Sequence, residues 1–131
     1  MKKKICIVQS VYNKEITEKL SSGANEELKK SGIYKIDIVK VPGAFEIPVM
    51  IARLVKKYDG FVAIGCIIKG ETLNFDLICN AITNGIMNIS IDEKKPVGNA
   101  ILTCFNTDQA LKRLEKGKEA AKAVINVLKM K

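Results

Sequence analysis

Residues 69–72 of the sequence read KGET, a glycine-centred turn that could bind an anion. The turn follows the apolar run FVAIGCII and precedes a segment with helical spacing. Backbone amides at the start of a helix are free to donate hydrogen bonds, and the helix dipole adds partial positive charge there. Gly70 allows close approach to the backbone, Thr72 can bind an oxygen, and Lys69 can add charge. A phosphate site and an ordinary capped turn fit equally well, whereas ATP and NAD are disfavoured because neither nucleotide motif is present.

Two more short stretches carry side chains that suit a flat, polar ligand. The stretch VPGAFEIP offers Phe45 and, beside it, Glu46, whose carboxylate can accept hydrogen bonds from two hydroxyls of a polyol. The stretch QSVYN offers Tyr12, which can stack on a heterocycle, and Asn13, which can bind a polar edge. Taken singly, each of these residues is more often structural than functional.

The chain contains no histidine, so no imidazole can transfer protons near neutral pH. Its four cysteines are widely separated and mostly lie in apolar runs, without any CxxC pair. This pattern is typical of buried thiols in a reduced protein, and it predicts neither a metal site nor a disulfide framework.

Length and composition predict one globular domain over residues 1–131. Hydrophobic residues make up 47% of the chain and aromatic residues only 5%, so the core should be aliphatic. The formal charge is +8, but the lysines are scattered, which favours a solvated surface or a phosphorylated small molecule over nucleic acid. No segment resembles a signal peptide or reaches the roughly 18 apolar residues of a membrane span, so we expect a cytoplasmic protein and no membrane partner.

Hydrophobic periodicity predicts four strands that alternate with four helices. The strands are expected at residues 4–10, 33–41, 61–68 and 97–105. The first helix should end near residues 31–32, the second should span about residues 44–57, and the third should begin directly after the KGET turn. The fourth should start at residue 106 or 107, and Gly117 marks a possible break within it. This alternation predicts a parallel sheet with helices on both faces, and ligands at the carboxyl ends of its strands.

In this order, three stretches resemble the lumazine synthase family. They are VPGAFEIP, the loop GxxIKGET with FD two residues further on, and LT followed by N-x-x-QAxxR. The resemblance covers nearly the whole chain and implies a flavodoxin-like α/β fold, a three-layer sandwich with a four-stranded parallel sheet.

The resemblance also implies an activity of riboflavin biosynthesis. Members condense 5-amino-6-(D-ribitylamino)uracil with 3,4-dihydroxy-2-butanone 4-phosphate to give 6,7-dimethyl-8-ribityllumazine, phosphate and water. They need no metal and no organic cofactor. They form homo-oligomers, as pentamers or multiples of pentamers, with active sites between neighbouring subunits. Riboflavin synthase is a candidate partner.

The resemblance implies a role for each residue that stands at a functional position of the family. Tyr12 stands at the aromatic position that stacks on the pyrimidine, where most members have Phe or Trp, and Asn13 follows it as in the family. Arg113 aligns with the arginine that pairs with the substrate phosphate, and a guanidinium suits that role. The remaining positions are Ala44, Phe45 and Glu46 at the ribityl and pyrimidine site, Ile67 and Ile68 at the pyrimidine edge, and Gly70, Glu71 and Thr72 in the phosphate loop.

Besides Tyr12, three positions depart from the usual pattern. Lys116 resembles a lysine of the family that lies further from the arginine in many members. Asn99 stands where many members have a Phe that closes the neighbour's pocket. Asn74 replaces the histidine of GETxHFD, which transfers protons in most members, and an amide cannot titrate near neutral pH.

The missing histidine leaves two hypotheses. Loss of a general acid or base typically costs about 10²-fold to 10⁴-fold in rate, while positioning and anion binding are retained. We therefore expect a slower synthase whose pH profile shows no enzyme group with a pKa of about 6.5. The alternative is a non-catalytic lumazine-binding, flavin-binding or assembly subunit of the same fold.

Overall fold

The computed structural model describes residues 2–130, and it arranges them in three layers around one parallel sheet. The strands are β1 (Lys4–Ser10), β2 (Lys35–Val41), β3 (Gly60–Ile68) and β4 (Val97–Cys104). The helices are α1 (Lys14–Lys30), α2 (Ile47–Leu54), α3 (Phe75–Glu93), α4 (Thr107–Leu111) and α5 (Lys116–Lys129), with 3₁₀ turns η1 (Ala44–Glu46) and η2 (Lys69–Glu71). The α/β class and the four-stranded parallel sheet predicted from the sequence are confirmed.

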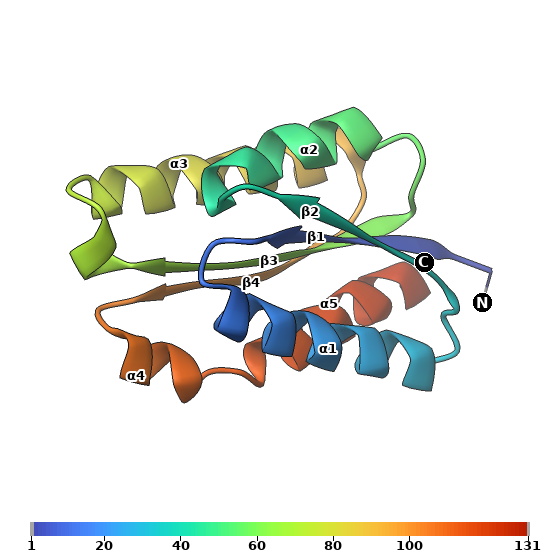
Figure 1. The fold of residues 1–131 in the computed structure, drawn as a ribbon. Coiled ribbons are helices and arrows are strands. Elements are labelled where there is room, and N and C mark those ends of the chain that lie inside the picture. Colours follow the sequence, from blue (N-terminus) through green and yellow to red (C-terminus); the bar gives the residue numbers. More distant parts are fainter. Residues whose placement is uncertain (1, 131) are drawn as a thin grey trace.

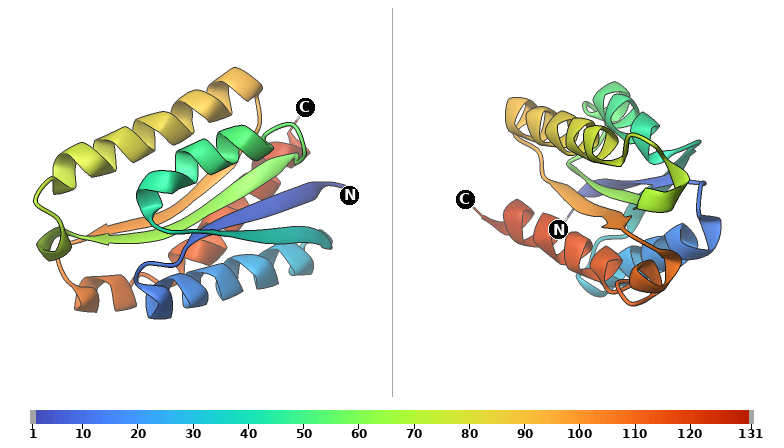
Figure 2. Two further views of the ribbon diagram at one scale, coloured as in Figure 1. Left: turned by 45° about the horizontal axis from the view of Figure 1, so that its top comes forward. Right: turned by 90° about the vertical axis from the view of Figure 1, so that its left-hand side faces the viewer.

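The sheet has the strand order β2-β1-β3-β4, with β1 and β3 in the centre. Helices α2 and α3 cover one face, while α1 and α5 cover the other (Figures 1 and 2). Strand β3 is buried along almost its whole length because both of its faces are covered, which explains its unbroken apolar sequence. Each face has its own apolar cluster: Leu20 and Val124 belong to the one under α1 and α5, and Ile51 and Ile86 to the one under α2 and α3.

The second helix is shorter than predicted. Its first turn is the 3₁₀ turn η1, and α2 ends at Leu54 rather than at residue 57. Pro48 lies in the first turn of α2, where a missing amide proton costs least. The early end allows Tyr58 to turn back into the core, where its ring packs edge-on against Phe61 with the centroids 5.7 Å apart.

The prediction of a break at Gly117 was wrong in its position. The chain turns at residues 112–115, and Gly117 lies in the first turn of α5. Asn106 caps α4, because its Oδ1 accepts a hydrogen bond from the Gln109 amide at 2.9 Å. Gly117 is buried against α1, and a Cβ there would lie 2.8 Å from the Leu20 carbonyl carbon. This glycine therefore allows the close approach of α5 to α1.

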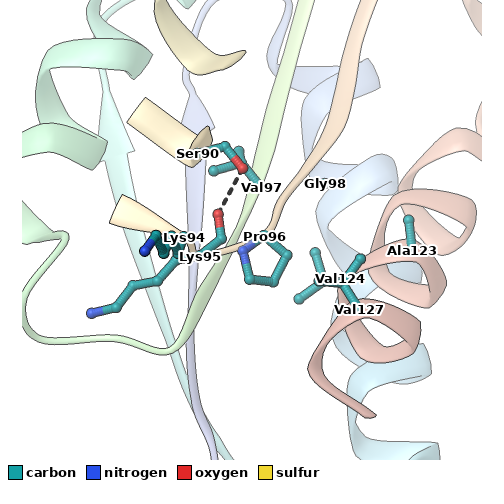
Figure 3. Close-up of a pocket in the computed structure, with 9 residues that line it drawn as sticks. All are labelled: Ser90, Lys94, Lys95, Pro96, Val97, Gly98, Ala123, Val124 and Val127. Carbon is teal, nitrogen blue, oxygen red and sulfur yellow. Dashed lines mark hydrogen bonds between the residues drawn. The ribbon is translucent and has the colours of Figure 1, made fainter. Parts of the chain in front are cut away.

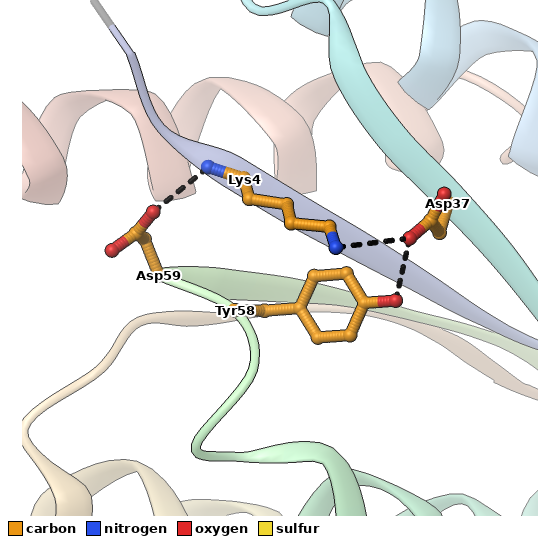
Figure 4. Close-up of polar contacts among 4 residues, drawn as sticks. All are labelled: Lys4, Asp37, Tyr58 and Asp59. Atoms are coloured by element: carbon orange, nitrogen blue, oxygen red, sulfur yellow. Dashed lines mark hydrogen bonds and ion pairs between the residues drawn. The ribbon is translucent and has the colours of Figure 1, made fainter.

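The amino ends of the three strands β1, β2 and β3 are joined by polar contacts (Figure 4). The Tyr58 hydroxyl donates to Asp37 Oδ2 at 2.6 Å, and Lys4 Nζ lies 3.7 Å from the same oxygen. The Lys4 backbone amide donates to Asp59 Oδ2 at 2.8 Å. The hydrogen bond to Asp37, followed by burial, raises the pKa of Tyr58, so this phenol stays protonated at neutral pH.

Within residues 2–130, no helix has the length and apolar character needed to cross a membrane. The same residues hold no group of three or more His, Cys, Asp or Glu side chains that could bind a metal ion.

Candidate active site

The loops that were expected to bind a ligand all lie at the carboxyl end of the sheet, at the left of Figure 1. A cavity of about 150 Å³ opens there, between the loops that follow β1, β2 and β3. Seven of the predicted site residues line it, together with Gly43, Cys66 and Ile78. The seven are Tyr12, Ala44, Phe45, Ile67, Ile68, Glu71 and Thr72.

The cavity has aromatic rings at its mouth and an apolar strand beneath them. Tyr12 is 56% exposed and Phe45 is 61% exposed, so both rings are open to a ligand. Ile67 and Ile68 come from the end of buried β3. Exposed rings on an apolar floor are suited to hold a flat heterocycle by stacking.

Glu46 already uses one of its carboxylate oxygens within the chain. Its Oε1 accepts a hydrogen bond from the Gly43 amide at 2.9 Å and thereby caps the 3₁₀ turn η1. The side chain is half-buried beside Phe45. This contact orients the carboxylate at the carboxyl end of β2, where it can accept hydrogen bonds from the hydroxyl groups of a ligand.

The KGET turn does not lead straight into a helix, contrary to our expectation. It forms the 3₁₀ turn η2, and α3 begins only at Phe75. Between them, Thr72 Oγ1 accepts a hydrogen bond from the Asn74 amide at 3.3 Å. A Cβ at Gly70 would meet no atom within 4 Å, so packing within the chain does not require this glycine. Its effect is to leave the backbone of the turn open to a ligand.

Asn74, which replaces the family's histidine, stands at the N-cap position of α3. Its side chain is exposed and makes no capping hydrogen bond, while its backbone carbonyl accepts from the Ile78 amide at 2.9 Å. The position is thus fixed by the helix, and the side-chain amide remains available to a ligand.

Arg113 and Lys116 lie elsewhere, in a second cavity of about 360 Å³ beside edge strand β4. Arg113 Nη1 contacts Cys104 Sγ at 3.8 Å. Asn99 also lies on β4, where its Oδ1 accepts from the Ile101 amide at 3.0 Å. Because the two cavities share no lining residue, one chain presents two separate sets of the predicted residues.

Sequence reasoning missed an aromatic contact between the loops after β3 and β4. Lys69 Nζ lies 5.3 Å from the centroid of the Phe105 ring, at the distance of a cation–π contact. The Phe105 and Phe75 rings pack with their centroids 6.5 Å apart. Phe105 is 61% exposed, and its place at the end of a predicted strand was the available signal. The Lys69 side chain therefore lies toward the loop that follows β4.

A cavity of about 370 Å³ lies at the opposite end of the sheet, between α3 and α5 (Figure 3). None of the predicted site residues lines it. The Ser90 hydroxyl donates to the Lys95 carbonyl at 2.7 Å, and Lys95 Nζ donates to the Val55 carbonyl at 2.7 Å. These polar groups hold the connection from α3 to β4, so cavity volume alone does not locate the candidate site.

Two buried thiols have strongly raised pKa values. Burial raises the pKa of Cys66 to about 12, and the neighbouring Cys104 and Glu71 add to this effect. Burial also raises the pKa of Cys6 to about 12, with a further contribution from Asp37. Both thiols therefore stay protonated at neutral pH and are poor nucleophiles.

The raised pKa values of these thiols lead us to expect that the free energy of unfolding falls at alkaline pH. Above the unperturbed pKa of 9.0 the unfolded chain releases the Cys6 proton while the folded chain keeps it, so the free energy of unfolding falls as pH rises toward 12. The expected slope is at most about 1.4 kcal/mol per pH unit for each such thiol. Urea unfolding at about pH 8 and pH 10 measures it. The Cys6→Ser variant should show a smaller drop, and an equal drop in both proteins would contradict this assignment.

Comparison with known proteins identifies the family. The sequence pattern of the family described as 6,7-dimethyl-8-ribityllumazine synthase matches residues 2–131. A 6,7-dimethyl-8-ribityllumazine synthase of Albidiferax ferrireducens is 42% identical over 131 residues, which cover 96% of this chain and 83% of the relative. Those of Paracidovorax citrulli and Limosilactobacillus reuteri are each 41% identical, over 94% and 96% of this chain and 83% and 86% of the relative. The chain therefore belongs to the 6,7-dimethyl-8-ribityllumazine synthase family.

Proposed function

We propose that the protein is an enzyme of riboflavin biosynthesis that condenses 5-amino-6-(D-ribitylamino)uracil with 3,4-dihydroxy-2-butanone 4-phosphate. The observation that carries this proposal is the cavity at the carboxyl end of the sheet, where Tyr12 and Phe45 flank an apolar floor. A pyrimidine can stack on such rings, and Glu46 lies where it can accept hydrogen bonds from ribityl hydroxyls. The open backbone of the KGET turn lies beside the cavity for the phosphate. The products are 6,7-dimethyl-8-ribityllumazine, phosphate and water.

The active site lies between neighbouring subunits in this proposal. Arg113 and Lys116 open onto a cavity of their own beside β4, so they can reach a phosphate on the KGET turn of a neighbour. A neighbour would also cover apolar side chains on one side of α3, because Leu77, Met87 and Ile91 are 71%, 56% and 63% exposed. These features support a homo-oligomer, for which we propose a pentamer or a multiple of pentamers.

The chemistry needs little from a titrating side chain. The 5-amino group of the pyrimidine attacks the ketone and one water leaves, and phosphate is then eliminated. The ring closes when the ribitylamino nitrogen attacks the carbonyl that this elimination leaves, and a second water is lost. Asn74 can donate a hydrogen bond to a substrate oxygen or hold a water, and the substrate phosphate itself titrates near neutral pH. The protein's part is to hold the two reactants together and to stabilise the leaving phosphate. We place the enzyme in the cytoplasm, with riboflavin synthase as the consumer of its product.

The decisive experiment follows lumazine absorbance after low concentrations of both substrates are mixed with the protein, between pH 5 and 9. Wild type should form product above the uncatalysed background, without an enzyme group of pKa about 6.5 in its profile.

The Asn74→His variant should turn over about tenfold faster and gain a titration near pH 6.5, because an imidazole then stands at the start of α3. Asn80→His, on an exposed position of the same helix, is the control and should leave the profile unchanged. A wild type that only matches the background, beside an active Asn74→His, would instead show a binding or assembly subunit.

A further inference from the structure

Asn13 has an unusual backbone conformation at the start of α1. Its φ and ψ are 58° and 48°, in the left-handed region that few residues other than glycine and asparagine adopt. Its carbonyl accepts hydrogen bonds from the Ile16 and Thr17 amides at 3.0 and 3.1 Å. The residue is therefore held firmly by the helix that follows it, and its side chain has a fixed origin.

The side chain of Asn13 reaches the loop after β3. Its Nδ2 donates to the Cys66 carbonyl at 2.9 Å and to Glu71 Oε1 at 3.1 Å. An asparagine amide has two N–H groups, and both are used. Asn13 therefore has no donor left for the edge of a pyrimidine, although the sequence suggested that role for it.

The contact with Glu71 concerns the charge beside the anion site. Glu71 is the third residue of the KGET turn, and its carboxylate is a negative charge next to backbone amides that are to receive a phosphate. A carboxylate and a phosphate that lie close together repel each other strongly in a partly desolvated site. The turn can bind an anion well only if this carboxylate is kept away from it.

We propose that Asn13 is a positioning residue that holds the Glu71 carboxylate at the loop after β1 and so keeps it away from the open backbone of the KGET turn, where an anion can bind. The hydrogen bond to the Cys66 carbonyl fixes the Asn13 side-chain amide relative to the end of β3. The hydrogen bond to Glu71 then holds the KGET turn relative to Asn13. This inference rests on the proposed function only in taking that anion to be the substrate's phosphate. The residue acts through Glu71 and does not touch the reacting atoms.

The test is a double-mutant cycle in which isothermal titration calorimetry measures the binding of inorganic phosphate to each variant. Asn13→Gly removes the side chain while keeping the left-handed backbone accessible. It should weaken phosphate binding about tenfold, because the freed Glu71 carboxylate then opposes the anion. Glu71→Gln should bind phosphate at least as tightly as wild type. The double variant should match Glu71→Gln, since no carboxylate is left to restrain.

Steady-state kinetics separates this role from direct recognition of substrate. Asn13→Gly should raise KM for the phosphorylated butanone and leave KM for the pyrimidine near its wild-type value. A tenfold loss of phosphate affinity that persists in the Glu71→Gln background overturns the proposal, and so does a rise in KM for the pyrimidine alone. Asn126→Gly, on an exposed position of α5, controls for the loss of an asparagine.

A second variant covers the case in which Asn13→Gly does not fold. Asn13→Asp keeps the shape of the side chain but sets a second carboxylate against Glu71, so its phosphate affinity should recover as pH falls and the pair takes up a proton. Because phosphate itself titrates in this range, the affinity is compared with that of wild type at each pH, and a ratio that does not change with pH counts against the proposal. Failure of wild type to turn over affects the proposed function alone, because phosphate binding is measured without the reaction.

Discussion

The Arg113→Ala variant is expected to lose about 10²-fold to 10³-fold in kcat/KM, because the phosphate then leaves without the guanidinium that we propose as its partner. Arg113 is exposed beside β4, and its contact with Cys104 Sγ is the one hydrogen bond that its side chain makes among residues 2–130. Its removal should therefore change the folded state little. Lumazine formation measures the loss, and the melting temperature should stay within a few degrees of wild type.

Two further variants define what the arginine contributes. Arg113→Lys keeps the charge but loses the planar pair of donors, so it should recover only part of the rate. Arg53→Ala removes an exposed arginine from α2 and should leave the rate unchanged. Full activity in Arg113→Ala would show that the phosphate is held by the KGET turn alone.

The same variant can test whether the site is shared between subunits. Glu46 and Arg113 would come from different chains, so the inactive Arg113→Ala and Glu46→Gln proteins should complement each other after they are unfolded together and refolded. Random assembly in equal amounts gives about one quarter of sites with both native residues. Recovery of about that fraction of wild-type activity supports a shared site, and no recovery contradicts it.

The Gly117→Ala variant is expected to lose about 3 kcal/mol or more of unfolding free energy. A Cβ at this position would overlap the Leu20 backbone, with the carbonyl carbon only 2.8 Å away, and a backbone cannot move aside as a flexible side chain can. Helix α5 would have to shift away from α1 and disturb the apolar cluster between them. Urea denaturation followed by circular dichroism measures the change.

Gly23 supplies a matched control on the facing helix. A Cβ at Gly23 would lie 3.8 Å from the Lys118 backbone nitrogen, which is an ordinary contact. Gly23→Ala should therefore be neutral or should stabilise the protein by about 0.5–1 kcal/mol, as expected for alanine in a helix. Similar behaviour of the two variants would contradict the close approach of α1 and α5 at Gly117.

The local pattern of the sequence was enough to predict most of the elements and the end of the sheet where the candidate site lies. Apolar spacing within a strand or helix depends on neighbours a few residues away, so it is readable without the fold. The unbroken run FVAIGCII is an example, and it became the buried central strand β3. Element ends were less accurate, as at α2, because the turn back of Tyr58 into the core decides where that helix stops.

Contacts between distant residues were decided by the tertiary structure alone. Asn13 meets Cys66 and Glu71 because parallel pairing sets the end of β1 beside the end of β3, and no local pattern carries that information. The sequence alone suggested that Gly117 breaks a helix, whereas the structure shows that it allows α5 to pack closely against α1. Arg113 could be matched to a phosphate role by sequence, yet only the fold shows it beside β4, away from the KGET turn of its own chain. The sequence thus determined the elements and the kinds of side chain, whereas their distances depend on how the strands and helices pack.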